Sequence, residues 1–493
     1  GDYIAGAFGA PSAPDGVLHI HSPADLDDHV SSHSFAQRQV AAAIDAAKTA
    51  EPGWRALALA ERAVLLRRYQ ARLRAHAPAI TATLCREIGK AAWDAAAEVQ
   101  AMTAKVDLML GEGLHWTQDR DLPALPGAVR YQPHGLMAVI GPFNFPGHLP
   151  NGLIVPALLL GNTVIFKPSD KAPGTATWIA RAMHEAGLPP GVFQMVQGPA
   201  QVAEALVESS AVDGVLFVGS VAVGQRILSA SAAFPGRLVA LELGGKNAAL
   251  LLPDCHVEAA VRELAFGAYA SCGQRCTATS RVFVPRPLLS EVQARLVAAA
   301  GRLVVGHPQD PGVFMGPLVS AAAQTRLQEA CQRAEAAGIE ALVAGTALTV
   351  AGRRGHYQGP SVHLAPEVHH RVAGYTHDEL FGPDLVLYPY DVLDDAVAAA
   401  NATDYGLVAS VFTADAARFA ALSARLRVGV VHHNRSTAGA SGQLPFGGIR
   451  KSGNHRPAGI LAGQLCAFPQ ALLYPKPGAG LPSWPGLFAT PEA

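Results

Sequence analysis

Three side chains hold the parts needed for covalent catalysis on a carbonyl group. Cys276, in SCGQRCTATS, is a thiol among small and polar residues, and an ionised thiol is a strong nucleophile. Glu242 ends the apolar run VALE directly before Gly-Gly, where its carboxylate is either a solvated strand end or a positioned base. Asn144 lies between two phenylalanines in GPFNFP. Its amide either caps a turn or stabilises an oxyanion where water is excluded.

Two further strand ends carry residues suited to a nucleotide. The run VIFKPSD places Lys167 and Asp170 where a strand ends, which is the usual ligand position in open α/β sheets. In FVGSVAVG, a strand leads through Gly219 and Ser220 into a helix that contains Gly224. The first amides of such a helix can bind phosphate, although small residues at this kind of turn also serve packing.

The elements that must position these residues follow from periodicity. Residues 35–110 show helical spacing of apolar residues. From residue 137 onward, short β-branched runs alternate with alanine-rich helical stretches, which predicts a parallel sheet in an α/β fold. Segments near 115–136 and 465–475 are expected to be extended. The length of 493 residues predicts two or three domains.

Composition narrows the class of partner. Lysine plus arginine, at 38, nearly balances aspartate plus glutamate, at 39, so no net field attracts nucleic acid or an anionic membrane. No apolar run reaches the length of a membrane span, and no signal peptide is visible. The six cysteines are few and scattered, so we expect free thiols, with Cys85, Cys331 and Cys466 in the core. We therefore expect a cytoplasmic protein with a small-molecule partner and no metal.

Taken together, the motifs resemble the aldehyde dehydrogenase superfamily. GPFNFP, VIFKPSD, FVGSVAVG, LELGGKN, GQRCT, DELFGP and PFGGIRKSG occur in the family's order over residues 25–475. The 34 residues between Glu242 and Cys276 also match the family's spacing. The resemblance implies a Rossmann-like cofactor domain, an α/β catalytic domain and a small β-ribbon for oligomerisation. The expected segments are a cofactor domain at 1–113 and 137–240, a catalytic domain at 241–443, oligomerisation segments at 114–136 and 465–476, and an irregular tail at 477–493.

The resemblance also assigns roles to individual residues. It makes Cys276 the nucleophile, Glu242 the general base and Asn144 the oxyanion donor, so that an aldehyde becomes a carboxylate through a thioester. Family members that transfer the acyl group to coenzyme A typically lack this glutamate, so hydrolysis is expected. Glu379 and Phe381, in DELFGP, would hold the nicotinamide ribose and ring.

The remaining carried-over residues concern the adenosine half of the cofactor. Lys167 and Asp170 would bind the ribose, while Gly219, Ser220 and Gly224 would lie near the pyrophosphate. Aspartate can accept a hydrogen bond from a 2′-hydroxyl and repels a 2′-phosphate, which favours NAD. Lys171, next in the chain, leaves NADP open. The extended segments near 115–136 and 465–475 predict a homodimer.

Two signatures resemble one subfamily, the succinylglutamate semialdehyde dehydrogenases of arginine catabolism. They are HLPNG after FNFP and NHRP after the last SG motif. A substrate of that kind carries two distal carboxylates, so its site should offer cations or dipoles. The candidates are His148, Asn151, Lys105, Arg275, and the loop 434–441 with Arg435 and Ser436. Arg275 has an alternative role, because its charge could lower the pKa of the neighbouring thiol.

Two alternatives remain open from the residues. The enzyme could oxidise a different aldehyde, because a few residues at the mouth of a site can change specificity without changing the chemistry. Alternatively, the protein could be a homologue without catalytic activity that acts as a binding or structural protein. The presence of Cys276, Glu242 and Asn144 argues against it.

Overall fold

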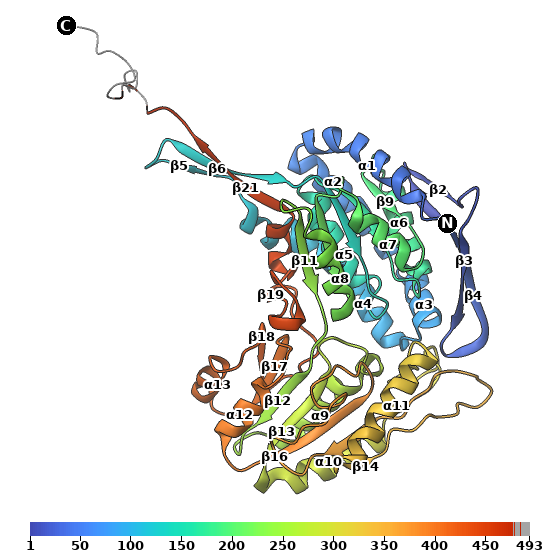
Figure 1. Ribbon diagram of the computed structural model, residues 1–493, viewed down its shortest axis with the longest axis vertical. Coiled ribbons are helices and arrows are strands. Elements are labelled where there is room, and N and C mark those ends of the chain that lie inside the picture. The colour runs from blue at the N-terminus through green and yellow to red at the C-terminus, as the bar shows by residue number, and fades with distance from the viewer. Residues whose placement is uncertain (477, 479–483, 485–493) are drawn as a thin grey trace.

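The computed structural model describes residues 1–476, 478 and 484, and shows two α/β lobes with a ribbon projecting from one of them (Figure 1). The tail expected to be irregular, 477–493, lies outside the described residues except at two positions. The predicted α/β fold with two mainly parallel sheets is confirmed. No helix in the described part of the chain is both long and apolar enough to cross a membrane.

The first lobe is built on a seven-stranded sheet that helices cover on both faces. Its central strands are continuous apolar runs, as expected when a parallel sheet is buried on both sides. Helices α1, α7 and α8 contribute to the core on one face, and α2 to α6 pack on the other. In sheet order the strands are β11 (Leu238–Glu242), β10 (Gly214–Val218), β7 (Leu136–Ile140), β8 (Thr163–Lys167), β9 (Phe193–Met195), β1 (Asp2–Ile4) and β2 (Ala7–Gly9). The helices are α1 (Gln39–Ala56), α2 (Leu59–Ala75), α3 (Ala77–Ile88), α4 (Ala92–Leu110), α5 (His148–Leu159), α6 (Pro173–Glu185), α7 (Ala200–Glu208) and α8 (Val221–Ser231).

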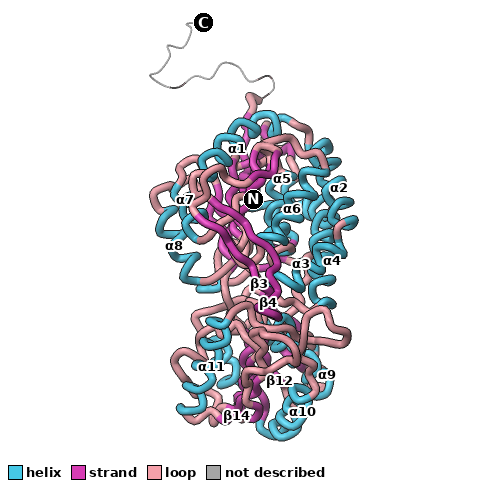
Figure 2. The backbone as a smooth tube through the Cα atoms, turned by 90° about the vertical axis from the view of Figure 1, so that its right-hand side faces the viewer, coloured by secondary structure: helices cyan, strands magenta, loops and turns pink. Residues whose placement is uncertain are grey.

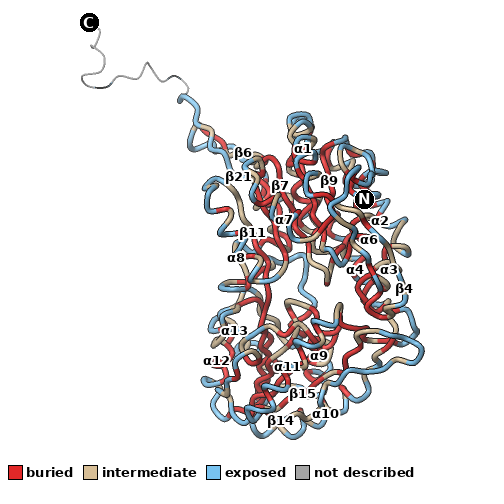
Figure 3. The backbone as a smooth tube through the Cα atoms, turned by 45° about the vertical axis from the view of Figure 1, so that its right-hand side comes forward, coloured by how far each residue is buried: buried red, intermediate tan, exposed pale blue. Residues whose placement is uncertain are grey.

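The second lobe has its own seven-stranded sheet and its own apolar core (Figure 3). All of its strand pairs are parallel except β14 with β15. In sheet order the strands are β14 (Glu340–Val343), β15 (Ser361–Leu364), β16 (Asp384–Tyr390), β13 (Thr279–Pro285), β12 (Asn247–Leu251), β17 (Val408–Phe412) and β18 (Val430–His433). The helices are α9 (Val257–Tyr269), α10 (Leu289–Gly301), α11 (Ala321–Ala336), α12 (Leu393–Asn401) and α13 (Ala416–Ser423).

The two segments expected to be extended pair with each other. Strands β5 (Arg120–Leu122), β6 (Gly127–Pro133) and β21 (Ala467–Leu473) form a three-stranded antiparallel sheet that projects from the first lobe (Figure 1). Large apolar side chains on this sheet and its turn are exposed, namely Leu122, Leu125, Phe468 and Leu473.

A β-hairpin near the N-terminus reaches from the first lobe to the second. Strands β3 (Gly16–Ser22) and β4 (Asp25–Phe35) run down one side of the molecule (Figure 2). At the tip, the backbone N–H of His356 donates to the Pro23 carbonyl at 2.9 Å, and the Tyr357 hydroxyl donates to the Ala24 carbonyl at 2.8 Å. No motif in the sequence indicated this connection.

The chain after the second sheet returns to the first and covers its edge strand β11. The covering segment lies between two short paired strands, β19 (Pro445–Phe446) and β20 (Ala458–Gly459). Gly453 forms an antiparallel bridge with Glu242. The Asn454 side chain accepts from the Leu241 N–H at 2.7 Å and donates to the Val239 carbonyl at 2.9 Å. Strand β11 thus runs to Glu242, past the boundary at 240 expected from the sequence, and the NHRP signature begins with the residue that holds this strand.

We predict that Asn454→Ala destabilises the protein and slows turnover. The substitution removes the side-chain partner of the Leu241 N–H and of the Val239 carbonyl in β11, at a cost of about 1–3 kcal/mol. It also loosens the strand that carries Glu242. Urea unfolding and kcat measure the two effects. Gln37→Ala, at an exposed position, is the control, and an unchanged urea midpoint for Asn454→Ala would contradict the prediction.

Candidate active site

The loop that carries Cys276 has a backbone few sequences can adopt. Ser271 and Cys272 have positive φ values of 55° and 56°. Gly273 follows at φ 64°, and a Cβ atom there would lie 2.1 Å from the Gly382 carbonyl oxygen. The segment from 271 to 273 is therefore fixed in a conformation that costs free energy, a common property of functional loops.

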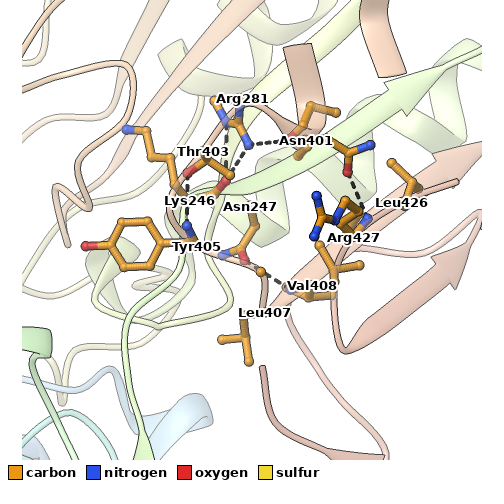
Figure 4. A pocket seen from close by; sticks show the side chains of 15 residues that line it. Lys246, Asn247, Arg281, Asn401, Thr403, Tyr405, Leu407, Val408, Leu426 and Arg427 are labelled. Carbon is orange, nitrogen blue, oxygen red and sulfur yellow. Dashed lines mark hydrogen bonds between the residues drawn. The ribbon is translucent and has the colours of Figure 1, made fainter. Parts of the chain in front are cut away.

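The same loop is held from behind by the start of β12. Asn247 donates from its side chain to the carbonyls of Cys276 at 2.8 Å and Ala278 at 2.9 Å, and it accepts from the Val408 N–H at 3.3 Å (Figure 4). Arg281 donates to the Lys246 carbonyl, which fixes the residue before Asn247. These bonds set the height of Cys276 above the sheet.

Asn144 comes from the other lobe and meets the nucleophile loop directly. Its side-chain amide is buried and donates to the Gln274 carbonyl at 2.8 Å, two residues before Cys276. An amide nitrogen has two donors, so one N–H remains for a ligand. The structure thus brings two of the three predicted catalytic residues together across the lobe boundary.

Glu242 completes the group. It is 3% exposed, and its Oε1 atom has no hydrogen-bond partner among the described residues. Burial raises the pKa of this carboxyl to about 8, although a backbone N–H at Gly448 opposes the shift. Burial also raises the pKa of the Cys276 thiol, and the nearby Glu242 and Glu379 carboxylates add to that effect. The Glu242 and Glu379 carboxyl groups are therefore close enough to Cys276 to influence its thiol.

Glu379 and Phe381 lie beside the turn after Glu242. The Glu379 carboxylate accepts from the Gly245 N–H at 2.9 Å, and burial raises its pKa to about 7. A Cβ atom on Gly244 would lie 2.3 Å from the Glu379 carboxylate, so this approach requires glycine at position 244. The Phe381 ring packs edge-on against Phe143, with centroids 5.8 Å apart.

Two predicted nucleotide residues lie at the carboxyl edge of the first sheet. Lys167 ends β8 and is buried, and no side chain or carbonyl in the described chain accepts from its ammonium group. Burial lowers its pKa to about 8. Asp170 follows on the exposed turn. An unpaired buried cation beside an exposed carboxylate fits a ligand that offers hydroxyl groups.

The small residues after β10 have two different roles, at the start of helix α8 and in packing. Ser220 caps helix α8, accepting from the Val223 N–H at 3.4 Å, and Gly219 donates its N–H to the Glu242 carbonyl at 3.0 Å. Gly224 is buried, and a Cβ atom there would lie 2.9 Å from the Leu243 side chain. Packing against Leu243 explains Gly224, whereas Gly219 and Ser220 lie at the helix start, where amides can hold phosphate.

The structure bears on the two roles considered for Arg275, whose charge acts to lower the pKa of the Cys276 thiol against the larger effect of burial. Its guanidinium donates to buried Asp94 at 2.9 Å and to the Ser271 hydroxyl at 2.9 Å, and it lies over the Phe145 ring. Arg275 is therefore already paired and is not a free cation for a substrate carboxylate. The sequence showed the residue type but not its partner on α4.

Two further candidate substrate residues make hydrogen bonds within the protein. Asn151 is fully buried, where it accepts from the Tyr69 hydroxyl at 2.7 Å and donates to the Met102 carbonyl at 2.9 Å. Ser436 is buried as well, and its hydroxyl accepts from the Ala438 N–H at 3.0 Å, which shapes the loop. Their polar atoms serve the fold.

His148 and Arg435 remain as candidates at the mouth. Arg435 is exposed, and no ion pair involves it in the part of the chain that the structure describes. His148 begins α5, four residues after Asn144, and its Nδ1 atom is buried without a partner among the described residues.

Comparisons with known proteins identify the family of this chain. The model of the aldehyde dehydrogenase family matches residues 11–466. The chain belongs to the aldehyde dehydrogenase family. N-succinylglutamate 5-semialdehyde dehydrogenase of Escherichia coli O9:H4 (strain HS) is 38% identical over 442 residues, 88% of each chain. The enzyme of the same name from Salmonella agona (strain SL483) is 38% identical over 468 residues, 92% of each chain.

Solved structures of the family share the whole fold. Aldehyde dehydrogenase C from Pseudomonas syringae, complexed with NAD+ and octanal, is 31% identical with a TM-score of 0.90, covering 96% of both chains. An NADP-dependent enzyme of E. coli is 27% identical with a TM-score of 0.90, covering 95% of this chain and 97% of that one. Both nicotinamide cofactors thus occur among similar structures.

Sequence reasoning missed a buried charged row that supports this site. Asp94 and Glu98 lie four residues apart on one face of α4, and Lys90 lies just before that helix begins. Lys90 pairs with Glu98, and Glu98 accepts from the N–H groups of Gly147 and His148 at 2.9 and 3.0 Å. The spacing of charges in an alanine-rich helix was the signal that could have revealed it.

We predict that Arg275→Met slows the oxidation of every aldehyde by a similar factor, because it disturbs the nucleophile loop rather than a substrate contact. It also leaves Asp94 buried without its partner, at a cost of about 3–5 kcal/mol. Urea unfolding and kcat/KM for a carboxylated and a neutral aldehyde test this. The double variant Asp94→Asn/Arg275→Met should recover part of the stability. A selective loss for the carboxylated aldehyde would restore Arg275 as a substrate contact.

Proposed function

We propose that this enzyme oxidises N-succinyl-L-glutamate 5-semialdehyde to N-succinyl-L-glutamate, a step of arginine catabolism, with NAD as the acceptor. The convergence of Cys276, Asn144 and Glu242 at the lobe boundary carries the chemical part of the proposal. The names of the 38%-identical relatives support the substrate.

In the first half of the reaction, the Cys276 thiolate attacks the aldehyde carbon. The free N–H of Asn144 donates to the oxygen as it becomes negative, and the backbone N–H of Cys276 assists. Water is largely excluded from this buried site, which strengthens these hydrogen bonds. The nicotinamide, when bound, supplies the hydride acceptor, and Glu379, Phe381, Lys167, Asp170, Gly219 and Ser220 would hold the cofactor.

In the second half, water hydrolyses the thioester. Glu242 accepts the proton of this water, and a carboxylate with a pKa near the working pH is well suited to that role. The acid product then leaves, and Cys276 is restored as a thiol. Hydrolysis rather than transfer to coenzyme A is the outcome that Glu242 supports.

The cofactor preference depends on Asp170. Its carboxylate is exposed on the turn after β8, where it repels a 2′-phosphate and can accept from a 2′-hydroxyl. The proposal of NAD over NADP rests on this charge. We further propose that the exposed apolar sheet of β5, β6 and β21 joins two copies in a homodimer, since Leu473 is 75% exposed in one chain. Cytoplasmic location belongs to the same proposal.

We predict that Glu242→Gln forms the thioester but hydrolyses it slowly, so rapid mixing should show one equivalent of reduced cofactor followed by a slow phase. In the wild-type enzyme the carboxyl must be ionised to act as a base. Because burial raises its pKa to about 8, deacylation should accelerate as the pH rises from 6 through 8 and then level off. The glutamine variant should lack this rise. A wild-type steady-state rate for Glu242→Gln would remove the base from the mechanism.

The substrate proposal is tested with a panel of aldehydes, each assayed with NAD and NADP. We predict the highest kcat/KM for N-succinylglutamate 5-semialdehyde with NAD, and no turnover in Cys276→Ala, which should still bind the cofactor. A higher kcat/KM for another semialdehyde or for an aliphatic aldehyde would assign the enzyme to that substrate. Asp170→Ser should raise kcat/KM with NADP relative to NAD.

A further inference from the structure

The buried charged residues on α4 and just before it leave one cation without an anion. Lys90 is paired with Glu98, and Asp94 with Arg275. Lys105, further along the same helix, is 6% exposed and donates only to the Gly459 carbonyl, at 2.7 Å. No carboxylate in the described part of the chain pairs with it. An ammonium group has three donors, so two remain unused in a place where buried charges are normally compensated.

A second unpartnered donor group lies beside it. Burial lowers the pKa of His148 to about 4, and the charges of the nearby Lys105 and Lys90 act in the same direction. The imidazole is therefore neutral, and its buried Nδ1 atom has no partner among the described residues. In the tautomer that carries its proton on Nδ1, the imidazole could donate a hydrogen bond to an acceptor beside Lys105.

The backbone leaves space next to these two groups. Gly152 follows His148 by four residues on α5, so both lie on one helical face. A Cβ atom on Gly152 would lie 3.9 Å from the Lys105 Cε atom. The missing side chain keeps that face of α5 open beside the Lys105 stem.

These groups are also next to the chemistry. His148 is one turn beyond Asn144, which contacts the nucleophile loop. Leu108 of α4 approaches the loop at Gly442, because a Cβ atom added to Gly442 would lie 3.4 Å from the Leu108 side chain. A substrate whose aldehyde carbon is at Cys276 would therefore extend its far end along α5 toward Lys105.

We infer that Lys105 and His148 form the subsite that binds a distal carboxylate of the substrate. The carboxylate supplies the anion that Lys105 lacks and accepts from the neutral imidazole, which makes two charge-assisted hydrogen bonds of the stronger kind. The inference rests on the proposed function, since it names the residues that recognise the anionic end of that substrate. Arg275, occupied by Asp94, has no part in it.

The decisive variant is Lys105→Met, which keeps the length of the side chain and removes its charge. Lys105→Gln, which can still donate to the Gly459 carbonyl, is the second variant. Arg68→Met removes an exposed cation of α2 that takes part in no ion pair among the described residues, and it serves as the control. Because removing an unpaired buried charge relieves a desolvation cost, Lys105→Met should fold at least as stably as the wild type in urea.

Two measurements are made on each purified, full-length protein. The first is the Kd of N-succinylglutamate, a carboxylated product, by titration calorimetry with NAD present. The second is kcat/KM for succinate semialdehyde and for butanal, which match in chain length and differ in the distal carboxylate, together with N-succinylglutamate 5-semialdehyde.

We expect Lys105→Met to weaken product binding about 10- to 100-fold, and to lower kcat/KM for the carboxylated aldehydes by that factor more than for butanal, mainly through KM. Arg68→Met should change neither ratio. Equal losses for butanal and the carboxylated aldehydes, or unchanged product binding, would overturn the inference. If the wild type prefers succinate semialdehyde and Lys105→Met removes that preference, the subsite stands and the proposed substrate falls.

Discussion

The active site depends on keeping two lobes in register, and a single face of α4 does this through buried ion pairs. Asp94 holds the nucleophile loop of the second lobe through Arg275, while Glu98 holds the start of α5 in the first lobe through two backbone N–H groups. Asn144, the proposed oxyanion donor, is just before that start. Because breaking a buried pair costs several kcal/mol, the distance between the amide and the thiol is fixed before any ligand arrives.

Burial gives the catalytic residues their other common property. The pKa of the Cys276 thiol and that of the Glu242 carboxyl are both raised, so the resting site carries little charge. A site without charge avoids the cost of burying an ionised group, and it becomes reactive only when one of these groups loses its proton. The same low-polarity surroundings strengthen the hydrogen bond that Asn144 can give to a developing oxyanion. Burial therefore both keeps the resting site neutral and strengthens the hydrogen bond used in the reaction.

The sequence was sufficient wherever the signal is local. The apolar strands alternating with helices, the turn after Glu242 and the polar setting of Cys276 all occupy short runs. The α/β class followed from the alternation, whereas the division into two α/β domains came from the resemblance to the family. Contacts between distant residues could not be predicted, because residue type does not reveal a partner. Arg275 was expected at the substrate and instead pairs with Asp94, 181 residues away. Asn454 was read as part of a signature, whereas it holds β11 from 213 residues away. No sequence motif indicated the β3–β4 hairpin that connects the lobes.

The return of the chain to β11 has a consequence for synthesis. The entire second sheet is inserted between strand β11 and the segment at 452–454 that covers it. A nascent chain emerging from the ribosome therefore completes the first sheet up to an open edge, and that edge stays uncovered until some two hundred further residues have been translated. Uncovered edges invite pairing with other chains. During that interval, chaperones or the rapid folding of the second lobe must protect the nascent enzyme from aggregation.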